Sequence, residues 1–135
     1  MRVAIVAQAT TRASLEALLA CLHSLDVLFL RTQLGVPPLY KSGVRYQAEP
    51  PLRGEERWLT IPEVIRQGTG DCDDLACWRA AELVASQLDE DARPEIVRAG
   101  PHVWHVIVRR GDGSSEDPSA VLGMRVPATR PEVPV

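Results

Sequence analysis

Cys72 is the residue of this chain best placed to act as a nucleophile. It follows Gly68-Thr-Gly-Asp71 and begins an expected helix, in which Asp71 and Asp74 have the spacing of a capping box. The unpaired N–H groups of a first helical turn and the positive end of the helix dipole favour a thiolate over a thiol. An inert, buried cysteine is the competing interpretation, so this position alone leaves the role of Cys72 open.

A hairpin is predicted further along the chain. Residues 101–110 have the composition of a strand, 111–113 of a tight turn and 114–117 of the returning strand, which Pro118 ends. If the loop has three residues, the last residue of the first strand pairs with Ser114. The side chains then alternate between the two faces of the hairpin in a known register.

This register brings one histidine close to one carboxylate. Ile107 falls opposite Asp117, and His105 lies two residues before Ile107 on the same face, so His105 and Asp117 become diagonal neighbours. A reactive cysteine needs a histidine that takes its proton and a carboxylate that orients the histidine. We therefore predict a catalytic triad of Cys72, His105 and Asp117.

The order of these three residues resembles the transglutaminase-like superfamily of papain-fold cysteine enzymes. The matching stretches are Gly70-Asp-Cys72-Asp-Asp-Leu-Ala76, the strand of His105 and Glu116-Asp-Pro-Ser119. The likeness spans roughly residues 40 to 124 and is greatest to the short stand-alone members of bacterial and phage genomes. It implies an α+β fold with a papain-like core, a nucleophile helix packed on a small antiparallel sheet, and acyl transfer at an amide or peptide bond through a thioester.

His102 competes with His105 for the role of the base. Many members of the superfamily carry His-x-Trp, and His102-Val-Trp104 fits that pattern. In a hairpin with a three-residue loop, however, His102 lies on the face opposite Asp117, so we prefer His105. A longer or bulged turn would reverse this choice.

An oxyanion hole needs a second donor besides the backbone N–H of Cys72. Tyr46, Gln47 and the indole N–H of Trp58 are candidates, because they precede the nucleophile within or just after a long connection over 39–53. Spacing identifies none of the three. Packing or turn formation is the simpler explanation for each of them.

Zinc binding by His102, His105 and either Cys72 or Cys77 is the alternative metal site. Side chains three residues apart on a strand point to opposite faces, which argues against it. The two aspartates that follow Cys72 are ordinary partners of a helix dipole. We therefore predict no metal and no cofactor.

Composition indicates one domain over residues 1–124. The chain has 135 residues, 45% of them hydrophobic, which is enough for a core. An apolar stripe predicts a scaffold helix within 10–35, and a strand over 95–98 is expected beside the His105 strand in an α+β layout. Three prolines in the last nine residues predict a flexible tail over 125–135.

Charge and cysteine content narrow the expected partners. The net charge of −3 favours neither a nucleic-acid surface nor a membrane surface, and the apolar start over 1–7 is too short to span a bilayer. Three cysteines without disulfide spacing fit a cytoplasmic protein. We expect a protein or peptide substrate, with hydrolysis slightly favoured over transamidation. The alternative is a non-catalytic binding or assembly protein of a phage-like particle, and the oligomeric state stays open.

Overall fold

The computed structural model describes residues 4–8, 11–48, 55–100 and 103–125. They form a mixed helix and strand fold, as the predicted α+β class requires. The elements in chain order are β1 (Ala4–Gln8), α1 (Arg12–Thr32), the 3₁₀ helix η1 (Leu39–Lys41), β2 (Arg45–Tyr46), β3 (Glu55–Leu59), α2 (Ile61–Gln67), β4 (Thr69–Gly70), α3 (Cys72–Ala85), β5 (Arg93–Gly100), β6 (Val103–Arg109), β7 (Ser115–Glu116) and α4 (Pro118–Val121).

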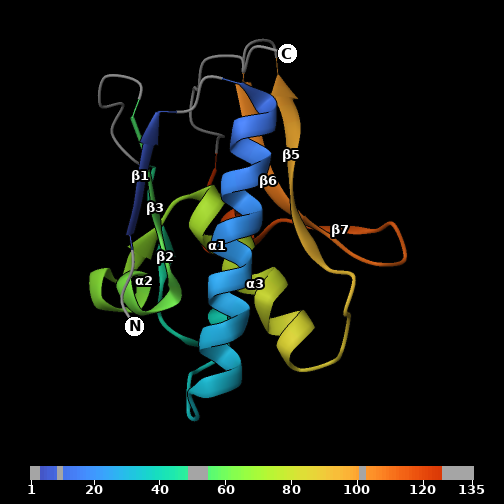
Figure 1. The fold of residues 1–135 in the computed structure, drawn as a ribbon. Coiled ribbons are helices and arrows are strands. Elements are labelled where there is room, and N and C mark those ends of the chain that lie inside the picture. The colour runs from blue at the N-terminus through green and yellow to red at the C-terminus, as the bar shows by residue number, and fades with distance from the viewer. Residues whose placement is uncertain (1–3, 9–10, 49–54, 101–102, 126–135) are drawn as a thin grey trace.

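The strands in the described part of the chain form three small sheets. β5, β6 and β7 form an antiparallel sheet in that order, β1 pairs with β3 antiparallel, and β2 pairs with β4 parallel. Figure 1 shows β1 and β3 on one side of the long helix α1, with β5, β6 and β7 on the other. The predicted strand over 95–98 is the middle of β5, and it lies beside the His105 strand as expected.

Helix α3 lies at the centre of the protein, packed against β5, β6 and α1. One of its sides, which includes Ala76 and Ala80, joins a core cluster with α1, β5 and β6. Its other side, which includes Leu75 and Trp78, joins a second cluster with η1, α2 and the end of β3. Ala76 and Ala80 on the first side and Leu75 and Trp78 on the other are all fully buried.

Helix α1 is the scaffold helix predicted within 10–35. Thr11 occupies the N-cap position, and its hydroxyl accepts the backbone N–H of Ser14 at 3.0 Å. The helix ends at Thr32, inside the predicted range, because Gln33 already has extended backbone angles. By length and composition alone α1 is apolar enough to cross a bilayer. In this fold, however, its stripe beginning at Leu15 packs into the core.

The pairings of β1 with β3 and of β2 with β4 were not predicted. Ala4 pairs with Leu59 and Arg45 pairs with Thr69, so the partners are far apart in sequence. Local patterns carry no signal for such pairs, since each strand is only two or five residues long. Part of the connection predicted before β3, residues 49–54, lies outside the described residues.

The C-terminal part of the domain forms α4 and its cap. Leu122 is buried in the second core cluster with Leu75, and its carbonyl accepts the backbone N–H of Tyr46 at 3.0 Å. This bond joins α4 to β2. The predicted tail over 125–135, apart from Arg125, lies outside the described residues, as does His102.

Candidate active site

Cys72 is the first residue of α3, directly after the N-cap Asp71. The Asp71 carboxylate accepts the backbone N–H groups of Asp73 at 3.1 Å and Asp74 at 3.4 Å, and Asp74 accepts the backbone N–H of Asp71 at 3.2 Å. The predicted capping box is therefore confirmed. It holds the Cys72 backbone in the first turn of a well-defined helix.

Two glycines deliver the chain to this helix start. Gly68 ends α2 in the left-handed region, at φ 81°, which a glycine adopts without strain. A Cβ on Gly70 would lie 3.2 Å from Asp74 Cβ and 3.2 Å from a methyl of Leu75. Gly68 is therefore required by its backbone angle, and Gly70 by the close approach of the Asp74 and Leu75 side chains.

The hairpin of β6 and β7 has the predicted register. The backbone N–H of Arg110 donates to the carbonyl of Ser114 at 2.8 Å, and Val108 pairs with Glu116. Gly113 has φ 90° and closes the turn by donating to the carbonyl of Arg110. The loop therefore has three residues, as the preference for His105 over His102 assumed.

The predicted proximity of His105 and Asp117 is confirmed. His105 Nε2 lies 3.0 Å from each carboxylate oxygen of Asp117. Asp117 is also the N-cap of α4, where one of its oxygens accepts the backbone N–H of Ala120 at 3.4 Å. His105 is buried, with 5% of its surface exposed, whereas the Asp117 side chain is 32% exposed. With Nε2 bound to Asp117, Nδ1 is the ring nitrogen left for a second partner.

Strand alternation separates this pair from the core that contains Cys72. Trp104, Val106 and Val108 belong to the same core cluster as Cys72. Successive side chains on a strand point to opposite faces, so His105 lies on the other face of β6. The structure thus brings His105 and Asp117 together. The meeting of this pair with Cys72, on which the predicted triad depends, stays a prediction.

Two neighbours of Cys72 have opposite effects on the balance between its thiol and thiolate forms. The residue is 2% exposed, and its sulfur lies 3.8 Å from Asp73 Oδ1, within S–H···O range. A carboxylate at this distance disfavours a neighbouring thiolate, whereas the helix N-terminus favours one. The protonation of Cys72 therefore depends on the balance between Asp73 and the helix, together with any nearby imidazole.

Two further buried acids hold the segment between β3 and α2. Asp74 accepts the backbone N–H of Leu59 at 2.7 Å, and Asp26 of α1 accepts that of Ile61 at 2.9 Å. Burial, followed by the charge of Asp73, raises the pKa of Asp74 to about 8. Burial also raises the pKa of Asp26 well above its ordinary value, and Asp26 Oδ2 has no hydrogen-bond partner within the described ranges.

The role of Asp26 was missed from the sequence, although a signal was present. Leu15, Leu19 and Leu22 mark the buried face of α1, and Asp26 continues their spacing by one more turn. An acid at a core position of a helix indicates a specific backbone partner or a neutral carboxyl group. Here Ile61 provides the partner and burial favours the neutral form.

Asp26→Asn is expected to stabilise the protein at high pH. The folded protein retains protons on Asp26 and Asp74 that the unfolded chain releases above the ordinary pKa of 3.8, so stability should fall as pH rises from about 4 towards 8. Asparagine can still accept the Ile61 N–H but carries no charge to desolvate. The variant should therefore be more stable than wild type at pH 8, by an amount typical of a single substitution, about 1 kcal/mol.

Urea unfolding of Asp26→Asn and wild type at several pH values measures this effect. Glu90→Gln, which changes an exposed acid, is the matched control and should leave the pH dependence unchanged. An equal slope of unfolding free energy against pH in Asp26→Asn and wild type would show that Asp26 is ionised in the folded protein.

Two of the three predicted oxyanion-hole candidates lie beside the loop before Cys72. Tyr46 pairs with Gly70 in the parallel ladder of β2 and β4, and the backbone N–H of Gln47 donates to the carbonyl of Gly70 at 2.9 Å. Gln47 is exposed, whereas Trp58 is 1% exposed and packed within the first core cluster. Burial in the core agrees with a packing role for Trp58.

The three cysteines are all free: Cys21 is exposed, and Cys72 and Cys77 are buried. Burial and several nearby acids, of which Asp26 acts most strongly, raise the pKa of Cys77 well above its ordinary value. This environment favours an inert thiol at Cys77. Across the residues that the structure describes, no three His, Cys, Asp or Glu side chains are grouped so that they could hold a metal ion.

The comparisons with known proteins give the chain no family. No family model, no curated protein and no solved structure matches it. The likeness to the transglutaminase-like superfamily therefore consists of the motif residues alone.

Proposed function

We propose that this protein is a cysteine-dependent enzyme that transfers acyl groups from an amide or peptide bond through a thioester, on a papain-like core of the transglutaminase-like kind. The observation that carries the proposal is the contact of His105 with Asp117 on the hairpin that packs against α3. A histidine bound by a carboxylate beside a helix that begins with cysteine supplies the three chemical groups of a thiol acyl transferase.

The proposed reaction uses each of these groups at a stated atom. With Nε2–H donated to Asp117, the Nδ1 lone pair of His105 takes the thiol proton of Cys72. The thiolate attacks the carbonyl carbon, and the imidazolium returns the proton to the leaving amine as the thioester forms. Water then resolves the thioester, which makes the protein a peptidase or amidase, whereas an amine acceptor would make it a transglutaminase. Asp117 orients the ring and stabilises the imidazolium.

The oxyanion of the tetrahedral intermediate needs two donors. The backbone N–H of Cys72 lies in the first turn of α3, at the positive end of the helix dipole, and is the proposed first donor. Gln47, held next to Gly70 by its backbone, is the proposed second donor.

His102 remains the second candidate for the base. The face of β6 that carries His105 is opposite to the face that packs against α3, and this placement weighs against His105. His102 is an even number of residues from Trp104, and it fits the His-x-Trp pattern of the superfamily. Separate substitution of His102 and His105 therefore tests which of them is the base.

A non-catalytic binding or assembly protein is the second candidate function. The observations that favour it are the burial of Cys72 and the contact of its sulfur with Asp73, both of which slow reaction with a substrate. This candidate predicts that Cys72 reacts with alkylating agents no faster than Cys21 or Cys77.

Alkylation by iodoacetamide, followed at each cysteine by peptide mass spectrometry across a range of pH, tests the proposal. Cys72 is expected to react with a thiolate pKa below the free value of about 8.5. That pKa should rise in His105→Ala and stay unchanged in His102→Ala. The exposed Cys21 serves as an internal reference for a free thiol.

The other possible alkylation results distinguish His102 as the base from a protein without a triad. A rise only in His102→Ala would transfer the role of the base to His102. If neither variant changes the pH profile, or if Cys72 reacts no faster than the buried Cys77, the triad is wrong and the binding protein becomes the better explanation.

A further inference from the structure

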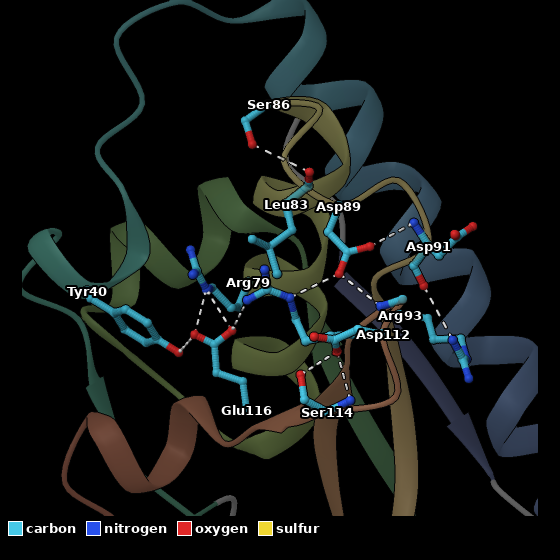
Figure 2. Close-up of polar contacts among 12 residues, drawn as sticks. Tyr40, Arg79, Leu83, Ser86, Asp89, Asp91, Arg93, Asp112, Ser114 and Glu116 are labelled. Atoms are coloured by element: carbon cyan, nitrogen blue, oxygen red, sulfur yellow. Dashed lines mark hydrogen bonds and ion pairs between the residues drawn. The ribbon is translucent and has the colours of Figure 1, made fainter.

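Arg79 is the one polar residue in the mostly apolar stripe that follows Cys72 along α3. It comes seven residues after Cys72, so it lies on nearly the same side of the helix, two turns further on and about 10 Å away along the axis. Its Nε lies 3.0 and 3.2 Å from the two carboxylate oxygens of Glu116 (Figure 2). Its Nη1 lies 3.1 Å from a carboxylate oxygen of Glu82.

The carboxylate of Glu116 contacts two other side chains besides Arg79. The hydroxyl of Tyr40 donates to the same carboxylate at 3.0 Å, and Arg110 Nη1 lies 3.6 Å from it. The Arg79 guanidinium also lies over the Tyr40 ring, 5.0 Å from its centroid. Figure 2 shows Tyr40 and Arg79 both directed at this carboxylate. The polar cluster of Tyr40, Arg79 and Glu116 therefore ties η1, α3 and β7 together.

The strand that carries Glu116 depends on this cluster. β7 has two residues and pairs with β6 at two positions, so its own ladder holds it weakly. The side chains of Arg79 and Glu116 are only 21% and 22% exposed, which strengthens their ion pair relative to a surface pair. The peptide bond after Glu116 leads directly to Asp117.

We propose that Arg79 is a positioning residue, which fixes Asp117 and with it His105 relative to the Cys72 helix by holding Glu116. The catalytic consequence of this role rests on the proposed function, whereas the structural consequence does not. One helix then sets both parts of the site, because it begins with the nucleophile and anchors the strand that ends at the orienting carboxylate.

A double-mutant cycle on acyl transfer tests the catalytic consequence. The probe is p-nitrophenyl acetate, and the measured quantity is the second-order rate constant for acetylation of Cys72. Arg79→Met should lower this constant by between about 10-fold and 100-fold, as expected for a small displacement of a catalytic group. In an Asp117→Asn background, Arg79→Met should have almost no further effect, because Arg79 acts through Asp117. Multiplicative effects of the two substitutions would overturn the proposal.

Arg66→Met is the matched control. Arg66 pairs with Glu63 three residues away on α2, as Arg79 pairs with Glu82 on α3. The Arg66→Met substitution should leave the rate constant for acetylation of Cys72 unchanged. Glu116→Gln is the second variant, in case Arg79→Met folds poorly, and it should reproduce the Arg79→Met effect because it removes the charge that Arg79 binds.

An NMR measurement separates failure of this proposal from failure of the proposed function. The His105 ring N–H that is bound to Asp117 should give a resonance protected from exchange with water in wild type and in Arg66→Met. That resonance should broaden or disappear in Arg79→Met and in Glu116→Gln. Its loss in protein that shows no Cys72 acetylation would support the positioning role and refute the enzyme, whereas an unchanged resonance in both variants would overturn the positioning role.

Discussion

Cys72→Ala is expected to lose all measurable acyl transfer, a fall of about 10⁴-fold or more, because the thioester cannot form without the sulfur. With p-nitrophenyl acetate as the substrate, wild type should release an initial burst of nitrophenolate and carry an acetyl group on Cys72. Stopped-flow absorbance and intact-protein mass spectrometry measure these two quantities. Both should be absent in the variant.

Cys21→Ala is the control for this loss, since Cys21 is exposed on α1. Its burst should match that of wild type. Cys72 is 2% exposed within the first core cluster, and alanine replaces it without a new polar group, so the folded structure should survive the change. A burst retained in Cys72→Ala would mean that the acyl transfer arises elsewhere, and the proposed mechanism would have to be abandoned.

Asp117→Asn is expected to lower the rate of acyl transfer by about 10²- to 10⁴-fold. The charge that stabilises the His105 imidazolium is lost, and the amide can present a donor to Nε2 in place of an acceptor. Steady-state hydrolysis of p-nitrophenyl acetate measures the loss. The stability of the fold should change little, because asparagine caps a helix about as well as aspartate does.

Asp117→Ala is the matched comparison for the cap. It should lower activity as Asp117→Asn does, and it should also cost about 1 kcal/mol of stability, because the hydrogen bond to Ala120 is lost. Full activity in Asp117→Asn would show that the pair of His105 and Asp117 serves the hairpin and α4 only. The search for the base would then move to His102.

Short-range features were predictable because their causes lie within a few residues. The capping box of Asp71 and Asp74 depends on a spacing of three residues, and it formed as predicted. The register of the hairpin follows from its three-residue loop, and the contact of His105 with Asp117 follows from that register.

Long-range features escaped prediction for the opposite reason. The partner strands β1 and β3 are separated by α1 and the long connection, and each strand is short. The buried contact of Asp26 with Ile61 likewise joins α1 to α2. Nothing local distinguishes these segments from ordinary loops or helix faces, since their stability comes from contacts made only in the folded chain.

The sequence by itself determined the parts of the candidate site: the cysteine at a helix start, the histidine on a strand and the acid at the end of the hairpin. The acid was predicted on the returning strand, but that strand ends at Glu116, and Asp117 caps α4 instead. Tertiary structure decided which face of β6 meets α3, how deeply Cys72 is buried and which carboxylate lies beside its sulfur. The physical reason is that turn geometry and helix capping act between near neighbours in the chain. The choice of the packed face depends instead on how α1, α3 and the sheet fill one core together.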